Sequence, residues 1–328
     1  MKEEEIRKRS VFNTYLELVE KDVKTFFNFK SFTETRCPAC ESSNFVVEFE
    51  KLGFQYASCK ICLTLWVNPR PRFEVLNEFY ARSPSTNFWV NNFFKPVAEV
   101  RREKIFKPRA EYISNLLNAQ KKNIVGDIGA GFGLFLEELR KMIPNSYYVA
   151  IEPSVEMSKI CVNKNIDVKC MCLEEIKGME ESFDLLTAFE LLEHLYNPTV
   201  FLETVYTLLK PGGYLFLTTL NGKGFDILLL WERSKSVAPP HHLNFFNIES
   251  VRLLVKKIGF EVVEISTPGK LDWDIVEGMI KNEHVFIDRF WSLLVSEKSE
   301  KCKIELQDWI SRNNLSSHMR ILLKKPVH

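Results

Sequence analysis

The sequence predicts a protein of the α/β class, with a parallel sheet covered by helices on both faces. Strands and helices alternate at regular spacing after residue 122, which is the pattern of such a sheet. One buried strand breaks into a glycine-rich turn over Asn123–Gly133, directly before a helix. Two cysteine pairs, Cys37/Cys40 and Cys59/Cys62, mark a second and smaller module nearer the N-terminus.

The elements of the sheet follow from hydrophobic runs and from the residues that interrupt them. Strands are predicted near 123–128, 146–151, 167–172, 183–189 and 213–220, with helices between them near 134–142, 154–164 and 199–209. Lys210-Pro-Gly-Gly213 ends the last of these helices. An amphipathic helix over 247–258 leads into a strand over 260–266. We predict that 318–326 returns to the same sheet, so that the helical segment 272–314 is an insertion.

The composition fits one large domain and a small one. The chain has 328 residues, 45% hydrophobic and 27% charged. Its net charge of +1 lacks the basic excess of nucleic-acid-binding proteins, so we expect no nucleic-acid partner. No apolar run is long enough to span a bilayer, and the charged start Met1–Glu5 is unlike a secretory signal. We therefore predict a cytoplasmic protein whose eight cysteines are metal ligands or free thiols.

The glycine-rich turn and a carboxylate on the next strand predict a nucleotide site. Gly129, Gly131 and Gly133 permit a tight turn and let a ligand approach the main chain. The helix that follows begins with N–H groups that can meet an anionic group. The next strand ends at Glu152, 19 residues after Gly133, where a carboxylate can accept hydrogen bonds from ribose hydroxyls.

Five motifs, in order, give the chain a family resemblance over roughly residues 105–328. They are Val125–Gly133, Ala150–Pro153, Phe183–Leu195, Leu209–Leu215 and Pro239–Phe246. Each is ordinary alone, but the ordered set resembles the class I S-adenosylmethionine (SAM)-dependent methyltransferases. The resemblance implies a Rossmann-like sheet of seven strands whose last strand runs antiparallel, which suits the strand predicted at 318–326.

The resemblance also implies a set of cofactor-binding residues. The glycine turn, with Ala130, would lie against the methionine part of SAM, and Asp127 would orient the turn or meet the amino group. Glu152, beside Pro153, would hold the ribose hydroxyls, and backbone groups near Cys172 and Leu173 would meet adenine. Phe189 completes this set. A dinucleotide such as NAD, or a turn without a ligand, are the alternatives.

An acid–histidine cluster, Glu190-Leu-Leu-Glu-His194, follows the fourth predicted strand. Ligands of open α/β sheets bind at the carboxyl ends of the strands, so Glu190, Glu193 and His194 are candidate catalytic residues. His194 is a candidate general base. The segment resembles the ubiquinone-biosynthesis O-methyltransferases, where it is associated with a divalent metal, and magnesium is the less favoured interpretation. The alternative is that Glu190 caps the next helix and His194 packs against the cofactor.

Two further histidines, His241 and His242, follow Pro239-Pro240 in a loop that we expect over the same pocket. They are candidates for binding the substrate or for acting as the base, and the alternative is that they fill a hydrogen-bonding gap.

The four cysteines at 37, 40, 59 and 62 form two C-x₂-C pairs separated by 18 residues. This spacing matches a zinc ribbon in which four thiolates hold one tetrahedral ion. Such an ion has no open coordination position, so its expected role is structural. A redox pair or four unligated thiols are the alternatives. A nucleic-acid role is disfavoured, because only Lys51 and Lys60 offset three glutamates in this interval.

The segment between the ribbon and the sheet is aromatic and basic. We expect a lid in which Tyr80 and Trp89 pack on the cofactor or substrate and Arg102 meets a carboxylate or phosphate. The alternative is that these aromatic residues seal an interface and that the charges are solvated. The predicted organisation is therefore a helical segment (1–33), a zinc ribbon (34–72), a helical lid or linker (73–120) and a SAM-binding domain (121–328).

These observations together predict a SAM-dependent enzyme that methylates a small molecule. O-methylation of a hydroxyl, on a sugar, a nucleotide-sugar or another biosynthetic intermediate, is the leading interpretation. C- or N-methylation is the near alternative. A non-catalytic scaffold that binds SAM, or a partner through its zinc module, is the alternative outside the enzymes.

Overall fold

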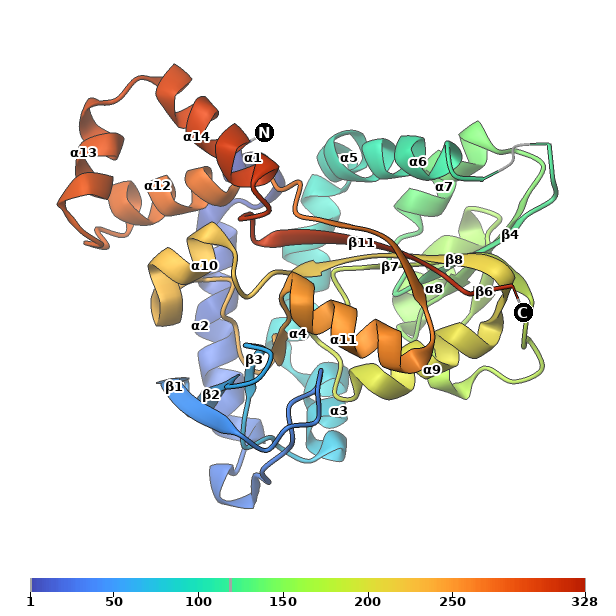
Figure 1. Ribbon diagram of the computed structural model, residues 1–328, viewed down its shortest axis with the longest axis horizontal. Coiled ribbons are helices and arrows are strands. Elements are labelled where there is room, and N and C mark those ends of the chain that lie inside the picture. Colours follow the sequence, from blue (N-terminus) through green and yellow to red (C-terminus); the bar gives the residue numbers. More distant parts are fainter. Residues whose placement is uncertain (1, 118–119, 328) are drawn as a thin grey trace. The chain divides into compact units, whose positions relative to one another are not determined.

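The alternation of strands and helices produces the expected sheet in the computed structural model, which describes residues 2–117 and 120–327 (Figure 1). The chain divides into two compact units. The first comprises residues 1–96, 220–251 and 266–319, and the second residues 97–219, 252–265 and 320–328. The four-segment organisation predicted from the sequence groups residues differently and stays a prediction. Residues 73–96 and the helical insertion 272–314 fall in the first unit.

The second unit is built on a seven-stranded sheet in the order β10-β11-β8-β7-β4-β5-β6. Its strands are β4 (Ile124–Ile128), β5 (Tyr147–Ile151), β6 (Asp167–Lys169), β7 (Phe183–Phe189), β8 (Leu209–Leu220), β10 (Glu261–Ser266) and β11 (His318–Lys324). The five strands from β4 to β8 are parallel. Their carboxyl ends therefore meet at one edge, where ligands of open α/β sheets bind.

The last strand, β11, runs antiparallel to β8, as the family resemblance implied. Backbone hydrogen bonds join Gly212 to Lys325 (2.9 Å) and Asn221 to Ser317 (2.7 Å), so residue numbers rise along one strand as they fall along the other. The predicted return of residues 318–326 to the sheet and the Rossmann-like fold class are confirmed.

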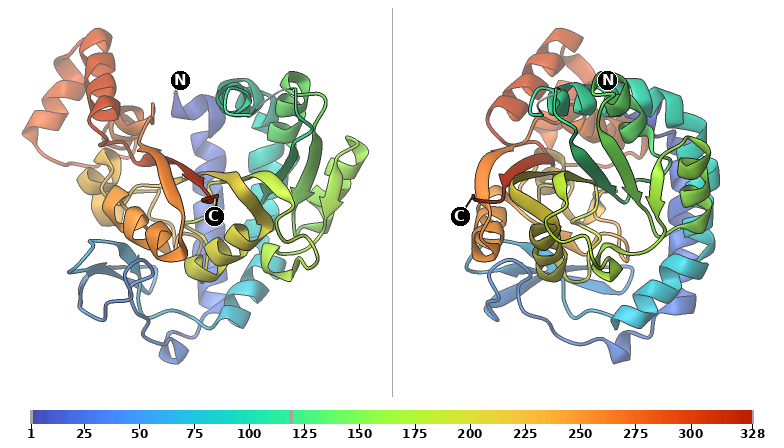
Figure 2. Two further views of the ribbon diagram at one scale, coloured as in Figure 1. Left: turned by 45° about the vertical axis from the view of Figure 1, so that its right-hand side comes forward. Right: turned by 90° about the vertical axis from the view of Figure 1, so that its right-hand side faces the viewer.

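Helices cover both sides of this sheet, with α6 and α7 on one side and α9 on the other (Figures 1 and 2). Buried side chains of α6 and α7, among them Ile113, Phe135 and Leu139, share a core with Val125 and Leu185 of the sheet. The helical elements of this unit are α5 (Ala98–Arg101), η4 (Arg102–Phe106), α6 (Lys107–Ser114), α7 (Leu134–Met142), α8 (Val155–Asn163), η5 (Leu173–Glu175) and α9 (Pro198–Leu208). Helix α11 (Ile248–Ile258) begins in the first unit and ends in the second.

Two predicted strand boundaries were wrong. Strand β6 ends at Lys169 instead of 172. Strand β8 begins at Leu209 instead of 213, because Leu209 already pairs with Phe183 of β7. The register between β7 and β8 shifts after this pair, which accommodates the proline and glycines of the segment within a strand.

The first unit combines helices with a small antiparallel sheet in the order β1-β2-β3-β9. Its strands are β1 (Phe45–Lys51), β2 (Phe54–Cys59), β3 (Leu65–Val67) and β9 (Asn244–Phe245). The first three form the predicted ribbon. The fourth was not predicted, because the sequence around it was interpreted as a loop. It pairs through Phe245 with Leu65 of β3.

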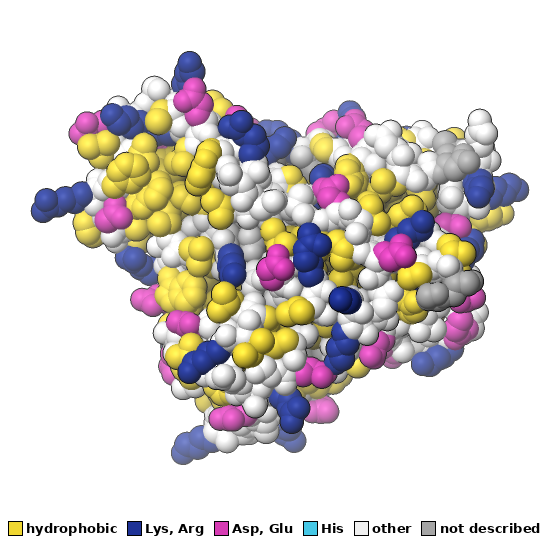
Figure 3. All heavy atoms as spheres, viewed as in Figure 1, with side chains coloured by type: hydrophobic (Ala, Val, Ile, Leu, Met, Phe, Trp, Pro, Cys, Tyr) yellow, Lys and Arg dark blue, Asp and Glu magenta, His cyan; other side chains and the backbone are white. Residues whose placement is uncertain are grey.

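The helices of the first unit come from three separate parts of the chain. They are α1 (Glu3–Ile6), α2 (Arg9–Phe26), η1 (Phe29–Ser31), α3 (Phe73–Arg82), α4 (Pro84–Phe88), η2 (Trp89–Phe94), η3 (Lys95–Val97, whose last residue lies in the second unit), α10 (Phe225–Leu230), η6 (Trp231–Arg233), α12 (Asp272–Asn282), α13 (Arg289–Glu297) and α14 (Glu300–Arg312). Leu230, Trp273 and Leu294 join α10, α12 and α13 in one core cluster. Hydrophobic side chains also gather on the surface over α12–α14 (Figure 3). In the loop between α12 and α13, Phe286 is 66% exposed. Across the residues that the structure describes, no helix has the length and apolarity to cross a membrane.

Two glycines of the turn provide a matched test of packing. Gly131 and Gly133 both have a positive φ, +56° and +68°. A Cβ on Gly131 would meet nothing within 4 Å, whereas one on Gly133 would lie 2.9 Å from Ile166 and 3.1 Å from the Cys161 sulfur. We expect Gly131→Ala to lower the free energy of unfolding by about 1 kcal/mol through backbone strain. Gly133→Ala adds overpacking of about 1–3 kcal/mol.

Urea unfolding of both variants checks this difference. Equal losses of stability in the two variants would contradict the assignment of Gly133 to packing.

Candidate functional site

The glycine-rich turn exposes its main chain between the ends of β4 and α7. Gly129 has room for a Cβ, whose nearest neighbour would be Leu191 at 3.9 Å, and the space beside Gly131 is open. Ala130, between them, is half-buried. Gly133 precedes α7 and is needed for packing. The turn therefore leaves its backbone open to a ligand at Gly129 and Gly131, and the contact of these glycines with a cofactor stays a prediction.

Glu152 stands at the end of β5 and binds this turn directly. Its Oε2 accepts a hydrogen bond from the Gly131 N–H (2.8 Å), and its Oε1 accepts one from the Ser154 N–H (2.9 Å). The side chain is 6% exposed, and burial raises the pKa of Glu152. A carboxylate has about four acceptor positions. Glu152 can therefore keep both bonds and still accept from a ribose diol, while Pro153 beside it is exposed.

Asp127 lies in β4, two residues before Gly129, and is buried. The Thr187 hydroxyl of β7 donates to its Oδ1 at 2.6 Å. Burial raises the pKa of Asp127 to about 7, and the hydrogen bond from Thr187 opposes that rise. The structure thus gives Asp127 an orienting contact inside the sheet.

Glu190 follows β7 with a φ of +49°, a backbone conformation that non-glycine residues seldom adopt. Its Oε1 accepts hydrogen bonds from the Arg109 guanidinium (2.8 Å) and the Thr218 hydroxyl (2.7 Å). The guanidinium of Arg109 lies over the ring of Phe189, 4.6 Å from its centroid. Arg109 thereby neutralises the charge of Glu190, and a magnesium ion at this cluster stays an untested alternative.

Glu193 is 1% exposed and accepts a hydrogen bond from the Thr219 hydroxyl at 2.8 Å. Burial, and then the charge of Glu190, raises the pKa of Glu193 to about 8. A carboxyl that is protonated at neutral pH is a poor general base. His194, which is half-buried, is therefore the better candidate base of the two.

The alternative in which Glu190 caps the following helix is wrong. Helix α9 begins at Pro198, and the Asn197 side chain accepts the hydrogen bond from the Val200 N–H that caps it.

The histidines of the later loop belong to the first unit. His241 is buried among the rings of Tyr15, Phe79 and Tyr80. Burial, and then His242, lowers the pKa of His241 to about 3, so its imidazole is neutral at physiological pH. His242 Nδ1 lies 2.5 Å from the Ser236 carbonyl oxygen. Joint action of these histidines with the cluster at Glu190–His194 stays a prediction.

The residues predicted to form a lid have other contacts. Tyr80 donates its hydroxyl hydrogen bond to the His241 carbonyl (3.3 Å), and Trp89 packs 4.7 Å from the ring of Tyr15. Arg102 donates to three carboxylates, those of Glu99 (3.0 Å), Glu137 (2.8 Å) and Glu138 (2.9 Å). For Trp89 these contacts favour the alternative of packing. Arg102 is ion-paired instead of solvated, and its predicted contact with a carboxylate or phosphate of a ligand stays untested.

The adenine subsite predicted after β6 is only partly available. The Cys172 N–H donates to the Glu175 carboxylate (2.7 Å), and the side chain of Leu173 is buried. The exposed thiol of Cys172 remains at the surface of this turn.

Four residues at the sheet edge were missed as site residues in the sequence. The hydroxyls of Thr187, Thr218 and Thr219 each donate a hydrogen bond to an acid of this edge, namely Asp127, Glu190 and Glu193 in that order. Arg109 donates to Glu190. Consecutive threonines at the end of a buried strand were the available signal for β8. Arg109 was noticed only as one of several basic residues on a helix.

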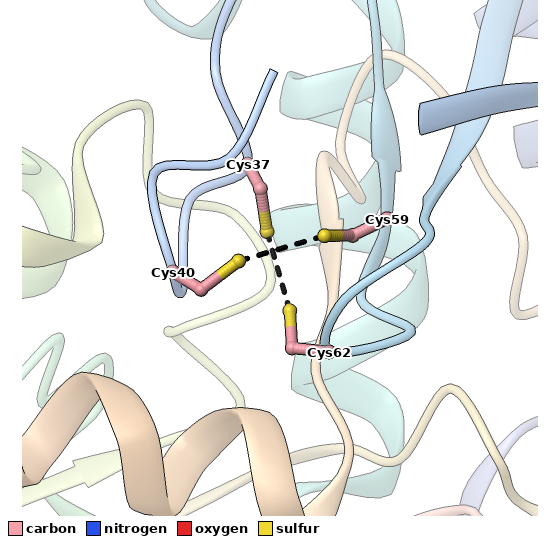
Figure 4. A group of neighbouring side chains, drawn as sticks. All are labelled: Cys37, Cys40, Cys59 and Cys62. Carbon is pink, nitrogen blue, oxygen red and sulfur yellow. Dashed lines mark hydrogen bonds between the residues drawn. The ribbon is translucent and has the colours of Figure 1, made fainter. Parts of the chain in front are cut away.

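The four cysteines of the ribbon converge on one point (Figure 4). Sγ atoms are 3.4 Å apart in the pair Cys37/Cys62 and 3.5 Å apart in the pair Cys40/Cys59, and all four lie within 4.8 Å of one another. Zn–S bonds of about 2.3 Å would place neighbouring sulfurs about 3.8 Å apart in a tetrahedron. Each C-x₂-C pair is followed by a left-handed residue, Glu41 or Leu63, so the two turns are alike. This donor set fits a tetrahedral metal ion.

Comparison with known proteins identifies the family of this chain. The model of a methyltransferase domain family matches residues 98–265, about half of the chain, including strands β4 to β8. The chain belongs to this family. The resemblance to class I SAM-dependent methyltransferases, drawn from five sequence motifs, is thereby confirmed.

Curated relatives of this chain include two bacterial ubiquinone biosynthesis O-methyltransferases. The protein of Coxiella burnetii (strain Dugway 5J108-111) is 29% identical over 141 residues, which are 40% of this chain and 57% of the relative. That of Xanthomonas euvesicatoria pv. vesicatoria is 32% identical over 120 residues, or 34% of this chain and 49% of the relative. The chain thus spans about half the length of the curated relatives it matches.

Solved structures share the fold of this chain at low sequence identity. The plantazolicin methyltransferase BpumL, in complex with SAH, aligns with a TM-score of 0.51 and 17% identity over 76% of this chain and 94% of that one. Phosphoethanolamine N-methyltransferase 2 of Haemonchus contortus aligns with a TM-score of 0.52 and 16% identity over 80% of this chain and 63% of that one. These likenesses concern the fold alone.

The buried carboxyl of Glu193 predicts that the stability of the protein depends on pH. Its pKa is raised in the folded state, so between about pH 4.5 and pH 8 the folded chain keeps a proton that the unfolded chain releases. The free energy of unfolding therefore falls with rising pH, by up to about 1.4 kcal/mol per pH unit from this group. Glu193→Gln imitates the protonated form, and we expect a smaller loss of stability from pH 5 to pH 8.

Urea unfolding at several pH values measures this slope. Glu203→Gln, on the exposed face of α9, is the control and should keep the slope of the unmodified protein. Parallel curves for Glu193→Gln and the unmodified protein would show that Glu193 is not the titrating group.

Proposed function

We infer that the methyltransferase binds SAM at the carboxyl edge of β4, β5 and β7 and methylates a hydroxyl of a small-molecule acceptor. The observation that carries this proposal is the Glu152 carboxylate bound to the Gly131 N–H (2.8 Å). A ribose-binding acid and bare glycine backbone are thereby held side by side.

The residues at this edge fit the cofactor. Open space beside Gly131 leaves room for a ligand, and a side chain there would occupy it. Glu152 offers remaining acceptor positions to a ribose diol. Asp127, fixed by Thr187, is placed to orient the turn or to meet an amino group. Bound SAM supplies an electrophilic methyl group on a sulfonium, and the chain need only align the acceptor with it.

We assign the acceptor side of the edge to the acid–histidine cluster. The ion pair of Glu190 with Arg109 and the buried Glu193 hold the turn that carries His194. His194 is our candidate to take the proton of the acceptor hydroxyl, because an imidazole can accept a proton at neutral pH. The names of the curated relatives support O-methylation, while their partial coverage leaves the acceptor to experiment.

A structural zinc ion in the ribbon is the second part of this proposal. Four sulfurs that meet within 4.8 Å leave no open coordination position, so the ion would crosslink two turns and take no part in chemistry.

Variants of Glu152 and His194 separate binding from turnover. We expect Glu152→Gln to weaken the binding of S-adenosylhomocysteine by about tenfold or more, because one acceptor for the ribose is lost. His194→Ala should keep that affinity and lower kcat by about 10²–10⁴. Calorimetry gives the affinity, and mass spectrometry of hydroxylated acceptors gives turnover as the replacement of one hydrogen by a methyl group.

The control is Glu156→Gln, an exposed glutamate on α8. Full affinity in Glu152→Gln would remove the assignment of the ribose site. Full turnover in His194→Ala would remove the assignment of the base.

Metal analysis of the purified protein tests the ribbon. We expect one zinc per chain, which is lost in Cys37→Ser together with about 2–5 kcal/mol of the stability of the first unit. Cys170→Ser removes an exposed thiol outside the ribbon and should change neither quantity. A chain that lacks zinc and keeps its stability in Cys37→Ser would contradict a structural metal site.

A further inference from the structure

A cleft in the first unit lies between the N-terminal helices, α12 and the loop after η6. Three cations line it, Arg7, Arg9 and Lys235, and two acids, Glu3 and Glu283. The lining therefore carries an excess of one positive charge. None of these residues belongs to the SAM site or to the ribbon.

Both acids of the cleft are already neutralised. Glu3 pairs with the Arg7 guanidinium at 3.4 Å. Glu283 accepts a hydrogen bond from Lys235 at 2.8 Å, which lowers the pKa of Glu283. The ammonium of Lys235 also donates to Asn13 (2.8 Å), so it retains one donor, and Arg7 retains several. An anion in the cleft would face donors instead of bare carboxylates.

Two polar side chains of the cleft, those of Arg9 and Ser236, have no hydrogen-bond partner within the described residues. Within residues 2–117 and 120–327, the guanidinium of Arg9 forms no hydrogen bond and no ion pair. In the same part of the chain the hydroxyl of Ser236 has no partner, although Ser236 is only 8% exposed. Arg9 is half-buried, so its five donors are held at the cleft without an acceptor.

The remaining wall of the cleft is apolar and contains a helical glycine. Phe12, Ile275 and Met279 supply the apolar surface. Gly278 lies in the interior of α12, where glycine weakens a helix by about 1 kcal/mol relative to alanine. A Cβ on Gly278 would lie 3.4 Å from Arg9 Nη2, so the glycine leaves space beneath the guanidinium.

We propose that this cleft binds a phosphate monoester with an apolar body. Arg9, Ser236 and the remaining donors of Arg7 and Lys235 would bind the phosphate, whose three oxygens need more donors than one carboxylate does. Phe12 and Met279 would contact the apolar body. The site does not depend on SAM, so it stands or falls separately from the proposed methyl transfer.

Calorimetry with phenyl phosphate and the full chain tests this site. We expect saturable binding, weaker binding of inorganic phosphate and phenylacetate, and none of benzyl alcohol. Arg9→Gln should weaken the affinity for phenyl phosphate by about tenfold or more. Gly278→Leu should weaken it at least as much by filling the cleft, while it improves the helix propensity of α12.

Lys8→Gln is the matched control, because Lys8 is an exposed cation next to Arg9 that does not line the cleft. Its affinity should stay within twofold of the unmodified protein. A Tm no lower than that of the unmodified protein shows that each variant is folded. The proposal is overturned if phenyl phosphate does not bind, if Arg9→Gln or Gly278→Leu retains full affinity, if Lys8→Gln loses as much as Arg9→Gln, or if phenylacetate binds equally well.

Discussion

The hydrogen bond between the Glu152 carboxylate and the Gly131 N–H is the contact on which the candidate site depends. It joins the end of β5 to the turn after β4, and so it holds the backbone that would receive a cofactor. A charged acceptor roughly doubles the strength of such a bond. Burial of this carboxylate also raises its pKa, because its charged form loses contact with water.

The other acids of this edge show the same balance between burial and function. Asp127, Glu190 and Glu193 each accept a hydrogen bond from a threonine on a neighbouring strand. A hydroxyl offsets part of the desolvation of a carboxylate without neutralising it. Glu190 also pairs with a cation, Arg109. The edge holds two buried acids, Asp127 and Glu193, whose pKa values burial raises, and the charge of Arg109 opposes that rise. Perturbed pKa values of this kind are common at functional sites.

Short sequence patterns predicted most strands and helices of the sheet. They could not predict contacts between residues that lie far apart in the sequence. The glycines at 129–133, the strand that ends at Glu152 and the paired cysteines are short-range signals, and each led to the correct element. Arg109 lies 81 residues before its partner Glu190, and no periodicity connects the two. The role of Gly133 in packing against Ile166 likewise depends on a neighbouring helix and strand that only the fold brings together. The start of β8 was missed because proline and glycine suggested a break, while pairing with β7 decided the outcome.

Strand β9 has a consequence for the order in which the chain acquires its structure. The ribbon is finished only when Phe245 pairs with Leu65 and the Asn247 side chain donates to the Cys62 carbonyl. During synthesis the cysteine turns emerge from the ribosome long before these residues. The ribbon is therefore first exposed with the edge of β3 unpaired. A segment cut out at 34–72 would keep that edge, and with it a tendency to pair with other chains.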